Sequence, residues 1–219
     1  MHSRNIKTFK YMETEKILII VDFQRDFCNP QGSLYVKGSE EALENIKKFL
    51  EENLVKEVIL TLDWHNYDDE SFKVNGGQWP VHCLQYSEGA GISDELMKII
   101  GEHELPYQIF RKGDDPTHEE YGAFEKKIQM HNSDNIMLVN HLETSMIMIK
   151  PDTEYVLCGI AGDYCVYETF KNLMKHGIKP RVFMDGMAFI NQKSLWMARH
   201  SLTKDGKAFI GEKFDLYER

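Results

Sequence analysis

Three side chains that could act together in hydrolysis stand at the ends of predicted strands. Asp22 ends an apolar, strand-like run, and Lys112 ends the predicted short strand YQIFRK. Cys165 stands in the first turn of a predicted helix after the strand-like run YVLCGI. In a parallel sheet the carboxyl ends of the strands share one edge, so residues distant in sequence can meet there. A cysteine at the start of a helix faces unpaired N–H groups and the positive end of the dipole, which favour a thiolate and lower its pKa. We predict that Cys165 is a nucleophile, that Asp22 accepts its proton and that Lys112 holds the pair by charge.

Each of these residues also has a purely structural interpretation. An aspartate at a strand end often caps the following turn, a lysine there often extends its amine to solvent, and a buried cysteine is commonly inert. Cys158, within a predicted strand, is expected to be such a core residue. The joint placement of all three side chains is what favours catalysis.

A second group of residues has the composition of a metal site. Asp63 and His65 are two positions apart in TLDWH, so in an extended segment they project to one face. His82, in WPVHC, could return as a third ligand. One divalent ion suits this imidazole and carboxylate set, with zinc as our first choice and iron or manganese as alternatives.

The elements that must position these residues alternate between strands and helices. We expect strands at 16–22, 57–63, 107–112, 135–139, 155–160 and 181–184. We expect helices at 39–54, 93–100, 117–129, 163–176 and 192–203, and we favour a helix for 142–149. This alternation predicts an α/β fold with three α/β/α layers and a mostly parallel sheet of about six strands. We expect one domain over 1–219, with 1–15 as a polar N-terminal extension.

Composition and charge exclude several classes of protein. The 219 residues carry 26 Lys and Arg against 35 Asp and Glu, a net charge of −9, which argues against nucleic-acid binding. The longest apolar run, 17–21, is far shorter than the ~20 residues of a membrane span, and the N-terminus resembles no signal peptide. Four cysteines are too few for a disulfide scaffold, so we expect a reducing, cytoplasmic setting. The apolar cluster 146–149 suits either a subunit interface or a core, which leaves a homo-oligomer open.

Six motifs between residues 16 and 185 occur together in a characteristic order. They are VDFQRDFCNPQGSL at 21–34, TLDWH at 61–65, GGQWPVHC at 76–83, FRKG at 110–113, EEYGAF at 119–124 and GIAGDYCV at 159–166. In these motifs the chain resembles the nicotinamidase (pyrazinamidase) family of the isochorismatase-like cysteine hydrolase superfamily. The pairing of TLDWH with WPVHC is what separates the metal-bearing nicotinamidases from metal-free isochorismatase relatives.

The resemblance implies an isochorismatase-like fold and a metal-assisted cysteine amidohydrolase of NAD salvage. Such an enzyme converts nicotinamide to nicotinate and ammonia through a thioester. The implied catalytic triad is Cys165, Asp22 and Lys112, and the implied metal ligands are Asp63, His65 and His82. Aromatic walls for the substrate ring are implied at Phe27, Trp79, Tyr121 and Tyr164. The implied oxyanion hole consists of the backbone N–H groups of Ala161 and Cys165, with a cis peptide bond before Ala161.

The chain departs from the family pattern at three places. Asp69 stands where a further histidine is common, and it could ligate the metal, hold a metal-bound water or lie solvated beside Glu70. Gly162 replaces the usual threonine or serine. The methionine-rich segment 131–152 is expected to alter a helix on the face of the sheet rather than the site.

Two other functions stay open at this point. One is a related cysteine hydrolase that acts on another small carboxamide or on a ureido compound. The other is a non-catalytic isochorismatase-like binding module, which would be expected to have lost one member of the Asp22, Lys112 and Cys165 set.

Overall fold

The computed structural model describes residues 16–130, 133–150, 153–191 and 209–210. Among the described helices, none combines the length and the apolar character that a bilayer crossing requires.

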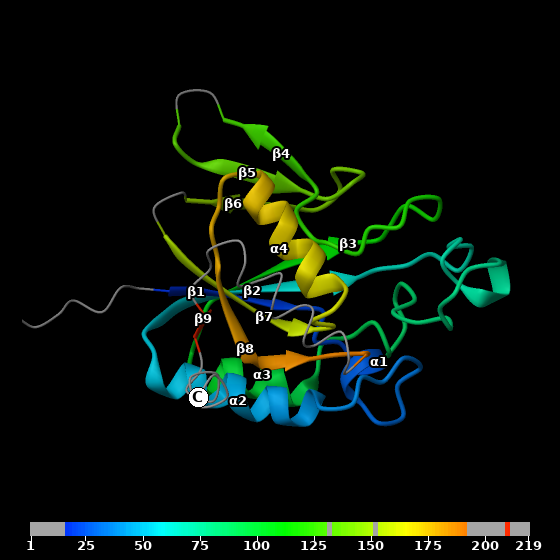
Figure 1. Ribbon diagram of the computed structural model, residues 1–219, viewed down its shortest axis with the longest axis horizontal. Coiled ribbons are helices and arrows are strands. Elements are labelled where there is room, and N and C mark those ends of the chain that lie inside the picture. Colours follow the sequence, from blue (N-terminus) through cyan, green and yellow to red (C-terminus); the bar gives the residue numbers. More distant parts are fainter. Residues whose placement is uncertain (1–15, 131–132, 151–152, 192–208, 211–219) are drawn as a thin grey trace, which may run out of the picture.

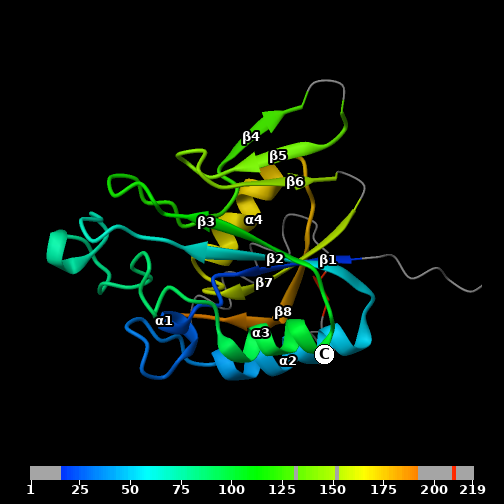
Figure 2. The ribbon, with the colours of Figure 1, turned by 180° about the vertical axis from the view of Figure 1, so that it is seen from behind.

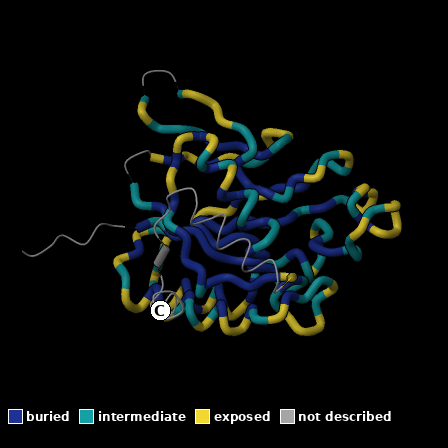
Figure 3. Tube along the Cα trace, in the orientation of Figure 1, coloured by how far each residue is buried: buried dark blue, intermediate teal, exposed yellow. Residues whose placement is uncertain are grey.

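A parallel sheet forms the centre of the molecule (Figure 1). Its strands, in spatial order, are β3 (Tyr107–Lys112), β2 (Val55–Asp63), β1 (Lys16–Val21), β7 (Glu154–Ile160), β8 (Arg181–Ala188) and β9 (Phe209–Ile210). Residues 18–21 of β1 are fully buried, because this strand has a partner on each side and covering layers on both faces. The tube in Figure 3 shows the same pattern, with buried strands inside and exposed turns outside.

Helices cover both faces of this sheet, which confirms the predicted α/β/α layers. Helices α2 (Ser39–Glu52) and α3 (Asp94–Glu102) lie on one face, and α4 (Cys165–Lys175) lies on the other (Figures 1 and 2). The helix α3 begins after Ser93, whose hydroxyl accepts a hydrogen bond from the Leu96 N–H. A single helical turn, α1 (Arg25–Cys28), and a 3₁₀ turn, η1 (Lys73–Asn75), lie in the connecting loops.

A second sheet, which the sequence did not predict, lies beside the edge strand β3. It is antiparallel and consists of β4 (Lys126–Gln129), β5 (Ile136–Val139) and β6 (Met146–Ile149). Its neighbour β3 donates the Arg111 N–H to Ser145 Oγ at 2.9 Å.

Three of the predictions are therefore wrong. No helix occupies 117–129, the favoured helix at 142–149 is replaced by β6, and the described part of segment 131–152, residues 133–150, contains β5 and β6 rather than a modified helix. The burial of β6 alternates between exposed methionines and buried isoleucines, which is the period of a strand. The strand at 135–139 exists but belongs to the second sheet, so five of the six predicted strands build the main sheet and the two-residue β9 completes it. The predicted helix at 192–203 lies outside the described residues.

Candidate active site

The catalytic candidates meet at the carboxyl edge of the main sheet. The chain runs from β1 to β2 and β3 on one side, then returns to β7 on the other side of β1. Ligands of open α/β sheets bind at such a reversal of strand order. Asp22 follows β1 and Cys165 follows β7, so these two residues flank the point where the strand order reverses. Asp63 ends β2 and Lys112 ends β3, and the two residues lie side by side in the register of these strands.

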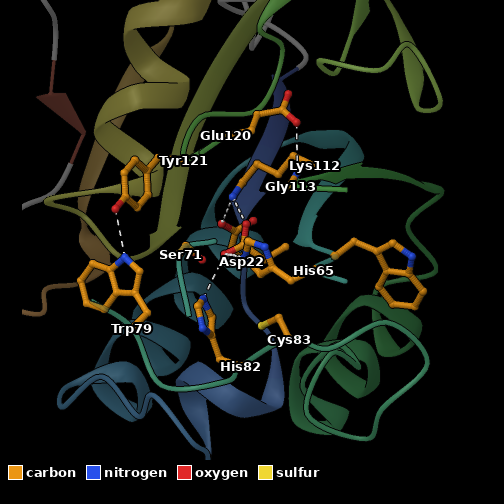
Figure 4. Close-up of polar contacts among 12 residues, drawn as sticks. Asp22, His65, Ser71, Trp79, His82, Cys83, Lys112, Gly113, Glu120 and Tyr121 are labelled. Carbon is orange, nitrogen blue, oxygen red and sulfur yellow. Dashed lines mark hydrogen bonds and ion pairs between the residues drawn. The ribbon is translucent and has the colours of Figure 1, made fainter. Parts of the chain in front are cut away.

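Lys112 is a buried cation between two carboxylates. Its Nζ lies 2.8 Å from Asp22 Oδ2 and also contacts Asp63 Oδ1 (Figure 4). The side chains of Lys112 and Asp22 are wholly buried, and that of Asp63 is nearly so. Burial alone would lower the pKa of Lys112, but the two carboxylates outweigh it and raise this pKa well above its usual value. The lysine therefore stays cationic.

Asp22 has the environment of a proton acceptor. Thr61 Oγ1 donates to Asp22 Oδ1 at 2.6 Å, whereas Asp22 Oδ2 makes an ion pair with Lys112 but no directed hydrogen bond within the described chain. Burial raises the pKa of Asp22 to about 6, against the opposing effect of the Lys112 charge. Near neutral pH the carboxylate is thus ionised and close to the pKa that suits a general base.

The sulfur of Cys165 lies within reach of this carboxylate. One donor atom each from Asp22, Asp63 and Cys165 lie within 4.8 Å of one another. Cys165 begins α4, as predicted. Burial nevertheless raises the pKa of its thiol well above the usual value. The charge of Lys112 lowers this pKa, whereas the carboxylates of Asp22 and Asp63 raise it further. The expectation of a lowered thiol pKa is wrong, because burial and two negative neighbours outweigh the helix start. Cys165 consequently needs a base to become a nucleophile.

The turn between β7 and α4 presents two backbone donors next to this sulfur. The Ile160–Ala161 peptide bond is cis, as predicted. Ala161 O accepts hydrogen bonds from Tyr164 N at 3.1 Å and Val166 N at 3.0 Å, which fixes the turn. The N–H groups of Ala161 and Cys165 have no backbone acceptor among the described residues, so both are available to an incoming oxyanion.

Gly162 in this turn has a packing explanation. A Cβ atom at this position would lie 2.4 Å from ring carbons of Phe189, a buried residue beyond β8. The aromatic ring therefore occupies the space that a threonine or serine side chain would need.

The predicted metal ligands also converge. The donor atoms of Asp63, His65 and His82 lie within 4.8 Å of one another, and all three residues are buried. His65 Nε2 is 3.6 Å and His82 Nε2 is 4.0 Å from Asp63 Oδ2. His82 reaches this place because the chain returns alongside the end of β2, where the His65 N–H donates to Cys83 O at 3.1 Å and Gln85 N–H donates to His65 O at 2.9 Å.

Each histidine is oriented through its other ring nitrogen. His65 Nδ1 lies 2.8 Å from Asp69 Oδ2, and His82 Nδ1 lies 2.8 Å from Pro80 O. Such partners hold a ring so that its Nε2 lone pair points to a metal. Asp69 is therefore placed to orient His65 rather than to ligate, and its neighbour Glu70 is exposed.

The charges of this group suit a cation. Burial alone would lower the pKa of His65, but the carboxylates of Asp63 and Asp69 outweigh it and raise this pKa to about 10. Burial lowers the pKa of His82. Without a metal, a proton on His65 compensates the carboxylates, and a divalent ion can take over that role.

Three of the four aromatic candidates contact one another, and the fourth packs against a metal candidate. Trp79, Tyr121 and Tyr164 contact one another, with Trp79 Nε1 donating to Tyr121 Oη at 2.9 Å and ring centroids 5.2 Å apart for Trp79 and Tyr164. Phe27 packs against the metal candidate His82 with a centroid distance of 5.5 Å. The structure thus brings together every site residue that the sequence predicted.

Glu120 is a buried residue that the sequence analysis missed. Its carboxylate accepts the N–H of Gly113, the residue directly after Lys112, at 3.0 Å (Figure 4). It also accepts the His141 N–H at 2.9 Å. Burial raises its pKa to about 7. The sequence EEYGAF contains two consecutive glutamates and does not indicate which of them is buried. Glu120 is the buried one because it accepts a hydrogen bond from His141, which follows β5 of the second sheet.

Comparisons with known proteins show which family the chain resembles. A family model, the isochorismatase domain, matches residues 16–105. A nicotinamidase of Acinetobacter baylyi is 30% identical, over 80% of this chain and 81% of its own length. A crystal structure of PnC1 from L. infantum in complex with nicotinate is 29% identical, with a TM-score of 0.70 over 91% of this chain and 94% of that one. The pyrazinamidase of Pyrococcus horikoshii in complex with zinc is 26% identical, with a TM-score of 0.65 over 90% of this chain and 98% of that one.

Proposed function

This chain belongs to the nicotinamidase family within the isochorismatase-like superfamily, and on that premise we propose that it hydrolyses nicotinamide to nicotinate and ammonia through a thioester on Cys165. One observation carries the proposal. The donor atoms of Cys165 and Asp22 lie within 4.8 Å at a sheet edge where Lys112 also pairs with Asp22, and the Asp63, His65 and His82 group adjoins them. The relatives named above support the substrate class.

We place one divalent ion at Asp63, His65 and His82, with zinc as the first choice and iron or manganese as alternatives. The donor set fits, because two imidazoles and one carboxylate leave coordination positions open, and partners at Asp69 and Pro80 hold the rings. When bound, such an ion would supply a Lewis acid that holds the ring nitrogen of the pyridine. The zinc complex of the related pyrazinamidase supports this choice.

The chemical steps are assigned to residues of this chain. Asp22 takes the proton of the Cys165 thiol, and the sulfur attacks the carboxamide carbon. The N–H groups of Ala161 and Cys165 donate to the resulting oxyanion, where loss of one such donor typically costs about 2.7–4 kcal/mol. Asp22 returns the proton to the nitrogen as the C–N bond breaks, and ammonia leaves.

The acyl group is then released by water. Asp22 accepts a proton from water, and the oxygen attacks the thioester carbon. Asp22 then returns this proton to the sulfur as the C–S bond breaks, which regenerates the Cys165 thiol, and the product acid loses its proton to solvent and leaves as nicotinate. Lys112 stays cationic in both halves and keeps Asp22 ionised between proton transfers. Trp79, Tyr121 and Tyr164 on one side and Phe27 on the other would enclose the ring.

The alternatives predict different residues or a different selectivity. A non-catalytic binding module would not need Cys165 within 4.8 Å of Asp22 or Lys112 paired with Asp22. A hydrolase of ureido or other carboxamide substrates would not need a metal group that can select a ring nitrogen. Free thiols at all four cysteines are consistent with our expectation of a cytoplasmic enzyme.

Ammonia release from nicotinamide and from benzamide tests the proposal. Benzamide has the same shape but lacks the ring nitrogen, so we expect zinc-loaded protein to hydrolyse nicotinamide and to lose most of its kcat/KM on benzamide. A chelator should raise the KM for nicotinamide. An absence of ammonia from nicotinamide would refute the activity, and equal rates on both amides would refute the role of the metal group.

A further inference from the structure

A second cluster of metal-type ligands lies outside the candidate active site. His118 and Glu125 lie on the loop between β3 and β4, and His141 follows β5. One donor atom each from these three residues lie within 4.8 Å of one another. Neither the proposed chemistry nor the proposed ligand set uses any of them.

The separations of these donor atoms are those of ligands on one ion. Glu125 Oε2 lies 3.0 Å from His118 Nε2 and 3.3 Å from His141 Nδ1. Two ligands at ~2.0–2.1 Å from a tetrahedral zinc are about 3.3 Å apart. The two imidazoles stack at 3.7 Å with 20° between their planes, so they must tilt apart about their side-chain bonds when an ion enters. Their side chains are 37% and 28% exposed, which leaves room for this rotation.

The local charge also favours a dication. Asp115 Oδ2 lies 3.6 Å from His141 Nε2, and hydrogen bonds from Thr117 N and Oγ1 hold the other oxygen of Asp115 at 3.0 and 2.8 Å. The Lys126 amine donates to the backbone oxygen of His141 at 2.5 Å and is paired with Glu143 Oε1 at 3.6 Å. The carboxylates of Asp115 and Glu125 are the acidic groups next to the two imidazoles, and the charge of Lys126 is offset by Glu143.

Asp115 lies beyond hydrogen-bond distance of the His141 ring, and the hydrogen-bond contact of that ring is between Nδ1 and Glu125 Oε1 at 3.4 Å. The Nδ1 atom of His141 thus faces Glu125 and is the ring nitrogen that would bind an ion together with this carboxylate.

We propose that His118, Glu125 and His141 form a second divalent-cation site, with a preference for zinc, cobalt, nickel or copper over magnesium or calcium. Two imidazoles and one carboxylate select these ions rather than the hard cations, which prefer oxygen ligands alone. The ion would join the 113–125 loop, which carries Glu120 and Tyr121, to the end of β5.

Metal counting with matched variants tests this site independently of catalysis. Chelator-stripped protein is loaded with excess Zn²⁺, freed of unbound ion by gel filtration and analysed by elemental mass spectrometry. The variants are His118→Ala/His141→Ala, His65→Ala/His82→Ala and the combination of both pairs. The control is His103→Ala, a partly exposed histidine at the end of α3.

We expect two zinc ions per chain in the wild type and the control, one in each double variant and none in the combination. The ion retained by His118→Ala/His141→Ala would show that this variant is folded. The wild type could instead bind one zinc ion that is lost in the His118→Ala/His141→Ala variant. This result would still support the inference, and it would refute metal binding by the Asp63, His65 and His82 group. An unchanged zinc content on removal of His118 and His141, or a wild type whose single ion disappears with His65 and His82, would overturn the inference.

The absorption of Co²⁺ gives a second readout that does not depend on unfolding. In the His65→Ala/His82→Ala variant we expect visible ligand-field bands, and adding His118→Gln should abolish them. Bands that persist in that variant would contradict ligation by His118.

Discussion

Substitution of Lys112 by methionine tests the electrostatic arrangement of the buried site. Methionine fills nearly the same volume, so the change removes the charge and leaves little cavity. It leaves Asp22 and Asp63 buried beside one another. Removal of one partner from a buried ion pair typically costs about 3–5 kcal/mol, which is at least about a fifth of the ~5–15 kcal/mol stability of an ordinary domain. Asp63 keeps His65 as a partner, so most of this cost falls on Asp22, which keeps the Thr61 hydroxyl.

The penalty should depend on pH in a defined direction. In the wild type, burial raises the pKa of Asp22 to about 6, and without Lys112 this pKa rises further. A carboxyl whose folded-state pKa is raised binds more protons in the folded chain than in the unfolded chain, so its contribution to stability is lost as the pH rises. The difference between variant and wild type should therefore be larger at pH 8 than at pH 6.

Urea unfolding of chelator-treated protein at these two pH values measures the effect. The matched control is Lys98→Met, because Lys98 is an exposed lysine on α3 that lies 3.8 Å from Glu102. We expect the control to change the free energy of unfolding by no more than about 0.5 kcal/mol at either pH. Equal effects of the two substitutions, or a penalty for Lys112→Met that grows on acidification, would refute our account of the buried charges.

Three further predictions concern the metal partner, the base and the nucleophile turn. Asp69→Ala should weaken zinc binding about 10–100-fold in a chelator competition assay, because His65 loses the carboxylate that orients it, and unchanged affinity would contradict that role. In a pH profile, kcat/KM should rise with pH through about 6 as Asp22 ionises, whereas a fall over this range would exclude Asp22 as the base. Gly162→Ala should lower the free energy of unfolding by about 1–3 kcal/mol, because the new methyl group would collide with the Phe189 ring. In a Phe189→Ala background the same substitution should cost less, and additive effects of the two substitutions would argue against this collision.

The sequence predicted the main sheet and the site edge because its signals there were local. The apolar runs that end in Asp22 and Asp63 are buried strands, whereas Lys112 ends a short edge strand whose first three residues are exposed. The carboxyl ends of parallel strands share one edge, which brings these three residues together. The two-residue spacing of Asp63 and His65 likewise needed only an extended backbone.

The remaining features depend on contacts that no local pattern contains. The second sheet exists because β6 pairs with β5 and lies beside β3, and a four-residue apolar run does not distinguish a strand from a helix. Asp69 meets His65 only once the 66–79 loop closes through pairing of Phe72 with Trp79. The thiol pKa depends on how deeply α4 starts in the molecule, which the position of Cys165 in its helix does not reveal.

Ammonia release by the Cys165→Ala variant tests the central claim most directly, with Cys158→Ala, a change in a buried strand residue, as the control. We predict that Cys158→Ala still hydrolyses nicotinamide, whereas Cys165→Ala releases no ammonia yet binds nicotinamide with nearly the wild-type affinity in calorimetry. Ammonia release that persists in Cys165→Ala would contradict the assignment of this sulfur as the nucleophile.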